Sequence, residues 1–245
     1  MKATVTEQKR LLDLQQIDNA LNTLRHRARS LPQDAHIRTL TAERDGHRIE
    51  LARHVGAQED IASEQAKLEA DSAMVEQRLD RDRTRLAAGG SAKDAQALEA
   101  EIQSLVARRG VLDEVLLEVM ERAEAAEARV TEARDVDGRL GEELTRAAAE
   151  REAELDRLNA ETASNLGQRQ ALADLVDADL LALYEQRRAR GGIGAALLRQ
   201  RACGGCTITL TGADLEEVRR APADEVVQCP ECSCILVRTE ESGIW

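Results

Sequence analysis

Aromatic residues are almost absent from this sequence. Its 245 residues include one Trp, one Tyr and no Phe, so the large rings that usually fill a globular core are missing. The chain is instead rich in Ala, Leu, Glu and Arg, and 33% of its residues are charged. This composition is typical of long helices and coiled coils. Most of the chain is therefore expected to be helical and not globular.

Long hydrophobic runs are missing as well. No apolar stretch approaches the roughly 18 residues of a membrane-spanning helix, and the polar residues after Met1 do not form a signal peptide. A net charge of −12 excludes a protein that coats nucleic acid with its whole surface. We expect a cytoplasmic protein with no membrane partner.

Apolar residues recur in steps of three and four, the spacing of a coiled-coil seam, along two long segments. The first seam opens with Leu14, Ile17, Leu21, Leu24, Ala28 and Leu31. Pro32 follows directly, and an interior Pro removes a backbone hydrogen bond and clashes with the preceding turn. The sequence therefore predicts a kink near residues 31–33.

Beyond that point the first seam is poor, because polar residues occupy many of its positions. They include Arg44, His47, His54, Gln58, Gln65, Ser72 and Asp82. This part of the coil should be loose or easily opened. The second seam, from Ala95 to Leu158, is regular and rich in Ala; its polar members are Arg109, Asp137, Arg151 and Glu154.

A Gly-Gly-Ser stretch separates the two seams and predicts a turn near residues 88–92. Because the seams are similar in length, we predict an antiparallel coiled-coil hairpin over residues 1–190. Counting outward from the turn places Leu14 opposite the region of Asn165. The second helix should end by Gly191-Gly192. The tip of the hairpin is assigned to Gly89, Gly90, Lys93 and Gln96.

A wider apolar stripe lies beyond the second seam, over Leu172, Leu175, Val176, Leu180, Leu183 and Tyr184. We expect it to pack against the C-terminal domain or against the first turns of the first helix.

Two C-x-x-C pairs, Cys203/Cys206 and Cys229/Cys232, lie near the C-terminus, and 22 residues separate them. This is the spacing of a four-thiolate structural zinc site. Two glycines inside the first pair and Pro230 inside the second suit tight turns. Four thiolates leave no coordination position for water, so one zinc ion here would stabilise the fold and do no chemistry.

Other interpretations of these thiols remain open. Disulfides need an oxidising compartment, and a redox C-x-x-C motif normally occurs once, beside a βαβ pattern. An iron centre of rubredoxin type uses the same four ligands. Cys234 is a fifth thiol, either a small side chain on the strand after the second pair or an alternate ligand or redox group.

The cysteine segment is interpreted as a small β zinc ribbon over residues 191–245. Strands are expected over 193–200, 207–210, 226–228 and 235–237, and a short helix over 214–220. The predicted fold class is thus mainly α: a long antiparallel coiled-coil hairpin followed by this ribbon. A structural zinc ion should be coupled to ribbon folding.

The chain resembles bacterial C4-type zinc-ribbon proteins that carry a long N-terminal coiled-coil hairpin. The two Cys pairs carry the resemblance, together with Ile235-Leu236 and the tip segment K-D-A-Q-A-L-E-A-E-I at 93–102. Ala95 stands where the family often has a large tip residue, and Cys234 and Val237 stand where Arg and an aromatic are usual. The resemblance implies a regulatory adaptor, since some relatives are implicated in binding an alternative sigma factor and messenger RNA.

The residues themselves favour a non-catalytic adaptor that binds a protein, or RNA or DNA. Phosphate contacts are assigned to an arginine collar, Arg187, Arg188, Arg190, Arg199 and Arg201, in a stretch without acidic residues. Tyr184 and Trp245 are too few to stack single-stranded bases. No acid–base constellation predicts an enzyme. The alternative is a coiled-coil scaffold or homodimer without nucleic-acid binding, favoured by the polar first seam.

Overall fold

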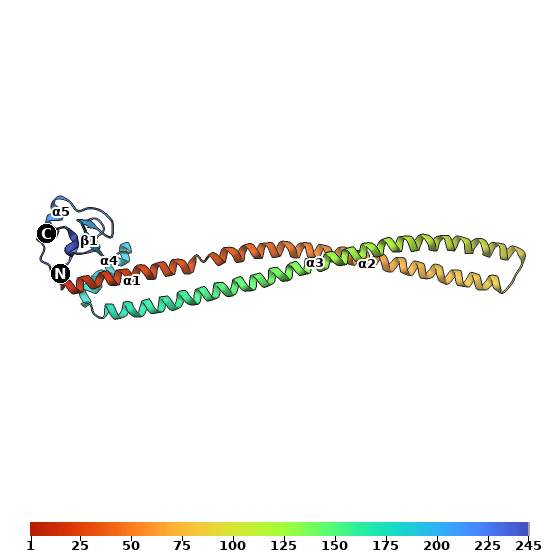
Figure 1. Cartoon of the computed structure of the whole chain (residues 1–245), viewed down its shortest axis with the longest axis horizontal. Coiled ribbons are helices and arrows are strands. Elements are labelled where there is room, and N and C mark those ends of the chain that lie inside the picture. The colour runs from red at the N-terminus through yellow and green to blue at the C-terminus, as the bar shows by residue number, and fades with distance from the viewer. Residues whose placement is uncertain (245) are drawn as a thin grey trace. The chain divides into compact units, whose positions relative to one another are not determined.

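The computed structural model describes residues 1–244, and Figure 1 shows the order of their elements. The chain begins with α1 (Val5–Arg29), α2 (Pro32–Ala87), α3 (Ala92–Ala173) and α4 (Ala178–Gly191). A small ribbon follows, made of β1 (Ala195–Arg199), β2 (Ala202–Cys203), α5 (Gly212–Arg220), β3 (Val227–Gln228), β4 (Ile235–Val237) and the 3-10 turn η1 (Glu240–Ser242). The predicted fold class is confirmed.

Packing divides the chain into two compact units. One unit comprises Met1–Pro32 and Glu150–Trp245, and the other comprises Gln33–Ala149. The predicted interruption near residues 31–33 is found, because α1 ends at Arg29 and α2 begins at Pro32. The domain boundary near residue 190 stays a prediction.

The unit formed by residues 33–149 is a helical hairpin made by α2 and the first part of α3 (Figure 1). Its turn is the predicted one, where Gly89 adopts the left-handed φ of 81° that a residue without Cβ tolerates. Ser91 caps α3 by accepting from the Asp94 N–H at 3.2 Å. Two clusters hold the arms together, one around Leu40, Leu140 and Ala147 and one around Val75, Leu79 and Leu105.

The middle of α2 is weakly packed, as its polar seam predicts. Its buried residues are Leu40, Val75, Leu79 and Asp82, so the long stretch between Leu40 and Val75 contains none. Two polar seam residues compensate each other there: Arg44 donates to both carboxylate oxygens of Asp137, at 2.8 and 3.2 Å. A paired Arg and carboxylate is tolerated at a half-buried position, but it contributes less than an apolar pair would.

The other unit combines α1, the end of α3, α4 and the ribbon. α1 begins with a capping box, in which Thr4 accepts from the Glu7 N–H and Glu7 accepts from the Thr4 N–H. One core cluster joins all parts of this unit: Leu11, Leu14, Ala173, Val176, Leu180, Tyr184, Ala195, Ile235 and Val237. The stripe before the ribbon therefore packs against both predicted neighbours.

The ribbon sheet has the order β2-β1-β4-β3. β1 runs parallel to β4, and the two outer pairs are antiparallel. Side chains alternate between its faces: Ala195 and Ile235 join the helical core, whereas Ala196 and Leu236 join a second core that contains Cys203, Cys229 and Cys234. The sheet thus separates α1, α3 and α4 from the cysteines, whereas Val218 of α5 packs on the cysteine side.

Two sequence predictions need correction. The second long helix is not continuous to Gly191, because the chain leaves it after Ala173 and Asp177 starts α4 by accepting from the N–H groups of Asp179 and Leu180. The segment 207–210 is no strand; Thr207 has a left-handed φ of 65°, and Thr209 makes only an isolated bridge to Ala202.

Ion pairs between the arms follow the count outward from the turn to within two residues. Arg44 pairs with Asp137, and Arg27 pairs with Glu154. The placement of Leu14 opposite the region of Asn165 stays a prediction.

Candidate metal centre

The first cysteine pair sits on a tight turn directly after β2. The Thr207 N–H donates to Cys203 O at 2.8 Å and closes the turn, and the Gly204 N–H donates to Leu197 O at 3.0 Å. A Cβ on Gly204 would lie 2.9 Å from that carbonyl oxygen, and one on Gly205 would lie 3.3 Å from Cys234 Sγ. The two glycines are therefore needed for close approach to β1 and to the fifth thiol.

The second pair repeats this turn ahead of β4. The Ser233 N–H donates to Cys229 O at 2.9 Å, and the Cys229 N–H donates to Cys234 O at 2.9 Å. The residue after each pair has a left-handed backbone, with φ of 65° at Thr207 and 61° at Ser233. Both turns thus use the same local geometry to direct two sulfurs inward.

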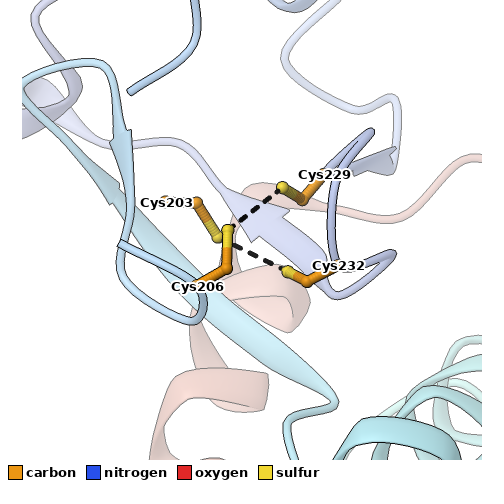
Figure 2. Close-up of side chains that lie close together, drawn as sticks. All are labelled: Cys203, Cys206, Cys229 and Cys232. Carbon is orange, nitrogen blue, oxygen red and sulfur yellow. Dashed lines mark hydrogen bonds between the residues drawn. The ribbon is translucent and has the colours of Figure 1, made fainter. Parts of the chain in front are cut away.

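The four predicted ligands converge. Their Sγ atoms all lie within 4.8 Å of one another, and the Cys203–Cys232 and Cys206–Cys229 sulfur distances are both 3.8 Å (Figure 2). A tetrahedral zinc ion with bonds near ~2.3 Å separates its sulfur ligands by about 3.8 Å. Cys203 and Cys229 are buried, Cys206 is half-buried and Cys232 is exposed. The donor set and its spacing fit one four-coordinate metal ion.

The free thiols of this cluster differ in acidity. Burial raises the pKa of Cys229 to about 12. Burial also acts to raise the pKa of Cys232, but the backbone N–H of Cys234 and neighbouring thiols outweigh it, and the pKa falls to about 7. Such a cluster becomes fully deprotonated only when a bound cation compensates the thiolate charges.

Comparison with known proteins finds family models that match both parts of this architecture. The model of the CT398-like coiled coil hairpin domain matches residues 14–192, and that of the C4-type zinc ribbon domain matches residues 202–236. The chain belongs to the CT398-like coiled-coil hairpin family. The resemblance drawn from the cysteine pairs and the tip segment is therefore confirmed.

The relatives share the full length of the chain. An uncharacterized protein of Mycobacterium tuberculosis is 36% identical over 241 residues, which cover 98% of each chain. A solved structure from Mycobacterium smegmatis has a TM-score of 0.84 and 38% identity over 98% of this chain and all of that one. CT398 from Chlamydia trachomatis, at 20% identity and a TM-score of 0.61 over 96% and 98% of the chains, shows the same fold.

The arginine collar is not a uniform basic surface. Arg188 is bound to Glu185, Arg199 lies 3.3 Å from a Glu241 oxygen, and the Arg201 Nε–H donates to Gly243 O. Arg187 is half-buried, with its Nε enclosed and without a hydrogen-bond partner, and Arg190 is exposed. Several collar charges are thus already engaged within the chain. Trp245 lies outside the described residues.

The tip residues lie together at the hairpin turn. Gly89, Gly90, Lys93 and Gln96 are all exposed, whereas Ala95 is half-buried beneath them. Their exposure leaves them open to contact with a partner, and a role in such contact stays a prediction.

A buried polar network on α1 was not predicted from the sequence. Asp18 accepts two hydrogen bonds from Arg169 and one from Tyr184 at 2.7 Å. Gln15 accepts from the Gly194 N–H at 2.7 Å and from the Ala195 N–H at 3.3 Å. The network connects α1 to the entry of the ribbon. The sequence feature that could have indicated it is the presence of two polar residues, Gln15 and Asp18, next to the seam of the first helix.

Arg238 is the second unpredicted feature. Only 7% of this residue is exposed, and its guanidinium donates to the carbonyl oxygens of Val218, Ala221, Pro222 and Glu225. Burial lowers its pKa, and the nearby Glu225 charge acts against that. Carbonyl oxygens at the end of α5 stabilise a cation there, so Arg238 fixes α5 and the following loop against β4.

No helix among residues 1–244 is both long enough and apolar enough to cross a membrane.

Proposed function

We propose that this protein is a non-catalytic adaptor in which one structural zinc ion stabilises a ribbon that binds a protein partner. Cys203, Cys206, Cys229 and Cys232 would hold the ion as thiolates and fill its coordination sphere. A filled tetrahedral sphere offers no site for a water molecule or a substrate. What the ion supplies is folding free energy, because small ribbons of this size bury too little apolar surface to fold unaided.

The observation that carries the binding role is a groove on the ribbon between α5 and β3. It has a volume of about 960 Å³ and is lined by apolar side chains that include Val218, Pro222 and Val227. Acidic residues line it as well: Asp214, Glu216, Glu217 and Glu225, against a single base, Arg220. A hollow that combines apolar lining with one sign of charge is suited to a partner of opposite charge.

The charge of this groove is only partly compensated. Glu216 is paired with Arg219 at 3.2 Å and reaches Arg220 at 4.0 Å. Among the described residues, no basic side chain forms an ion pair with Asp214 or Glu217 within 4 Å, whereas the charges of Lys2 and Arg238 act on Glu225. The groove is therefore negative, and it favours a segment rich in Arg and Lys.

The outer strand of the sheet adds a backbone component. Cys229 donates to Cys234 O, so alternation along the β3–β4 pair turns the backbone groups of Gln228 away from β4. Residues 1–3 of this chain occupy the part of the edge that precedes β3: the Val226 N–H donates to Met1 O, and the Ala3 N–H donates to Asp224 O. A further extended segment would therefore pair from Gln228 onward. We therefore propose that the occupant is an extended basic peptide of a partner protein, bound along β3.

The test is a titration of the full chain with a labelled peptide pool rich in Arg and Lys, next to a Glu-rich pool. The triple variant Asp214→Lys/Glu217→Lys/Glu225→Lys should lose binding by tenfold or more. Its matched control is Glu121→Lys/Glu124→Lys/Glu132→Lys, which changes net charge equally on exposed positions of α3 and should bind like wild type. Added salt should weaken the complex.

Equal binding by both triple variants would overturn the proposal. Mixed RNA, used as a third probe at low salt, separates the other class of partner. Suppose that wild type binds RNA in a salt-dependent manner, that Arg187→Gln/Arg190→Gln does not, and that the basic peptide pool is not bound. This result would assign the contact to the arginine collar instead.

A second candidate function is that of a coiled-coil scaffold that self-associates. It is favoured by large apolar side chains exposed on the hairpin arms, among them Met74, Val106, Leu117 and Met120, next to the poorly packed stretch of α2. The occupant would be a second copy of this chain. Light scattering across a concentration range tests it: Leu117→Gln should shift a dimer towards monomer, and a concentration-independent monomer would exclude this role.

A further inference from the structure

Cys234 brings a fifth sulfur to the edge of the metal centre. Its side chain is fully buried, and its Sγ lies 3.4 Å from Cys232 Sγ and 3.6 Å from Cys203 Sγ. The two sulfurs that it contacts are themselves 3.8 Å apart. Cys234 is therefore as close to two of the ligands as the ligands are to one another.

We infer that Cys234 is a reserve ligand of this centre, which replaces Cys232 or Cys203 when either thiolate is lost. The inference rests on the proposed zinc site and concerns which thiols of this chain can complete it. Because a four-coordinate ion uses only four thiolates, the fifth sulfur is spare while all four ligands are intact. Cys234 lies outside the group of four sulfurs that are all within 4.8 Å of one another, so the ion would move towards Cys234 to regain four sulfur ligands after such a loss.

Two structural features place this reserve sulfur firmly. Its own backbone carbonyl accepts from the Cys229 N–H, which ties it to the second turn, and it directly precedes β4. From the other side, Gly205 of the first turn leaves room for the sulfur, since a Cβ there would lie 3.3 Å away. The thiol is thus enclosed between the two turns that carry the ligands.

The arrangement is asymmetric, and the asymmetry makes it testable. Close sulfur–sulfur contacts join Cys234 to Cys203 and Cys232, whereas Cys206 and Cys229 form the other 3.8 Å pair. Cys234 can therefore replace a ligand on one side of the centre only. Cys232 is also the exposed member of the set, so it is the thiolate that oxidants and alkylating reagents reach first. A reserve ligand next to it would let the ribbon keep its metal after such damage.

The experiment measures metal content in purified full-length variants by elemental analysis, and their cobalt(II) spectra, in which thiolate-to-metal absorption reports the number of sulfur ligands. Cys232→Ser should retain its metal with four sulfur ligands, and Cys234→Ser should resemble wild type. Cys232→Ser/Cys234→Ser should lose its metal. Cys206→Ser is the matched control without a reserve, and it should lose its metal as well.

Each result decides the question. Metal loss from Cys232→Ser equal to that from Cys206→Ser would overturn the inference, and so would retention by Cys232→Ser/Cys234→Ser or failure of Cys232→Ser to fold. Absence of bound zinc in the wild type would instead overturn the metal site itself. For an independent reading, iodoacetamide should alkylate wild type at Cys232 with the metal retained, whereas alkylated Cys234→Ser should release it.

Discussion

Asp18 carries a full negative charge in a position where almost no water reaches it. The residue is 2% exposed, and burial by itself would raise the pKa of its carboxyl group. Hydrogen bonds from Arg169 and Tyr184, together with the charges of Arg169 and Arg188, outweigh this effect, and the pKa of Asp18 is lowered. Charged groups are buried only when paired and hydrogen-bonded. Asp18 therefore depends on groups from both α3 and α4, and it fixes these helices to α1.

Replacing this carboxylate should destabilise the unit that contains the ribbon. We expect Asp18→Asn to lower its free energy of unfolding by about 1–3 kcal/mol, because Arg169 loses its buried partner and keeps only Glu185, and because Tyr184 loses a charged acceptor. The measurement is urea unfolding followed by hydrogen exchange in α1 and α4 peptides. Asp13→Asn, on an exposed position of the same helix, is the control and should change stability by less than about 0.5 kcal/mol.

The pH dependence of that difference has a definite sign. Since the folded pKa of Asp18 lies below its ordinary value, its contribution is complete above about pH 4 and is lost as the pH falls through the folded pKa. The gap between wild type and Asp18→Asn should therefore be constant near neutral pH and close in acid. A gap that widens towards low pH would contradict this account.

Tyr184 provides an optical report on the same network, because it is the one tyrosine of the chain. Burial raises its pKa above the ordinary 10, and the hydrogen bond to Asp18 and the Asp18 charge add to the shift. Tyrosinate absorbance should thus appear above pH 10 and coincide with unfolding. In Asp18→Asn it should appear at lower pH, whereas Asp13→Asn should match wild type. Ordinary titration in the folded wild type would contradict the buried position.

Thr207 is the residue after the first cysteine pair, and its left-handed φ of 65° is costly for a β-branched side chain. Thr207→Gly should stabilise the ribbon by about 0.5–1 kcal/mol by removing this strain. Thermal release of metal to an indicator dye is the measurement. Thr209→Gly, whose φ is not left-handed, is the control and should stabilise nothing.

At the scale of elements, local residue patterns predicted the helix ends and the cysteine turns well. Pro32, Gly89 and Gly192 impose their backbone geometry on any fold, and two C-x-x-C pairs can converge on one ion whatever surrounds them. The break after Ala173 carried no such signal, because only the cap at Asp177 marks it. Arg238 could not be assigned either, since its four carbonyl partners belong to a helix end and a loop that only the folded ribbon brings together.

Metal loss should unfold the ribbon and leave the long helices folded. The core next to the cysteines contains Leu198, Leu210, Val218 and Leu236, and it depends on the two turns that the ion would join. We expect Cys206→Ser, or treatment with a strong chelator, to unfold the ribbon while most helical circular dichroism remains. Elemental analysis and hydrogen exchange of ribbon peptides are the measurements. Equal zinc content in variant and wild type would contradict the prediction.

At the scale of the whole molecule, hydrophobic periodicity located the seams, but it did not show that they belong to two packing units. The seam of α3 passes through both units as one continuous helix. The units differ in which residues pack together. The clusters around Leu79 and Leu140 contain only residues from 33–149, whereas the clusters around Leu14 and Leu158 contain only residues from 1–32 and 150–244. Pattern reading along one segment cannot reveal which partner each seam residue meets.

The separate cores predict separate responses to mutation. Leu79 is fully buried in the cluster with Val75 and Leu105, so Leu79→Ala should destabilise the hairpin by about 2–4 kcal/mol through lost burial and the cavity that remains. Protection of α2 peptides from hydrogen exchange should fall, while metal content and the Tyr184 absorbance stay at wild-type values.

Leu14→Ala is the reciprocal change, because Leu14 shares its cluster with Tyr184, Ile235 and Val237. It should weaken the ribbon and leave the Leu79 region protected. Equal loss of protection in both regions from either substitution would show that the two units unfold as one.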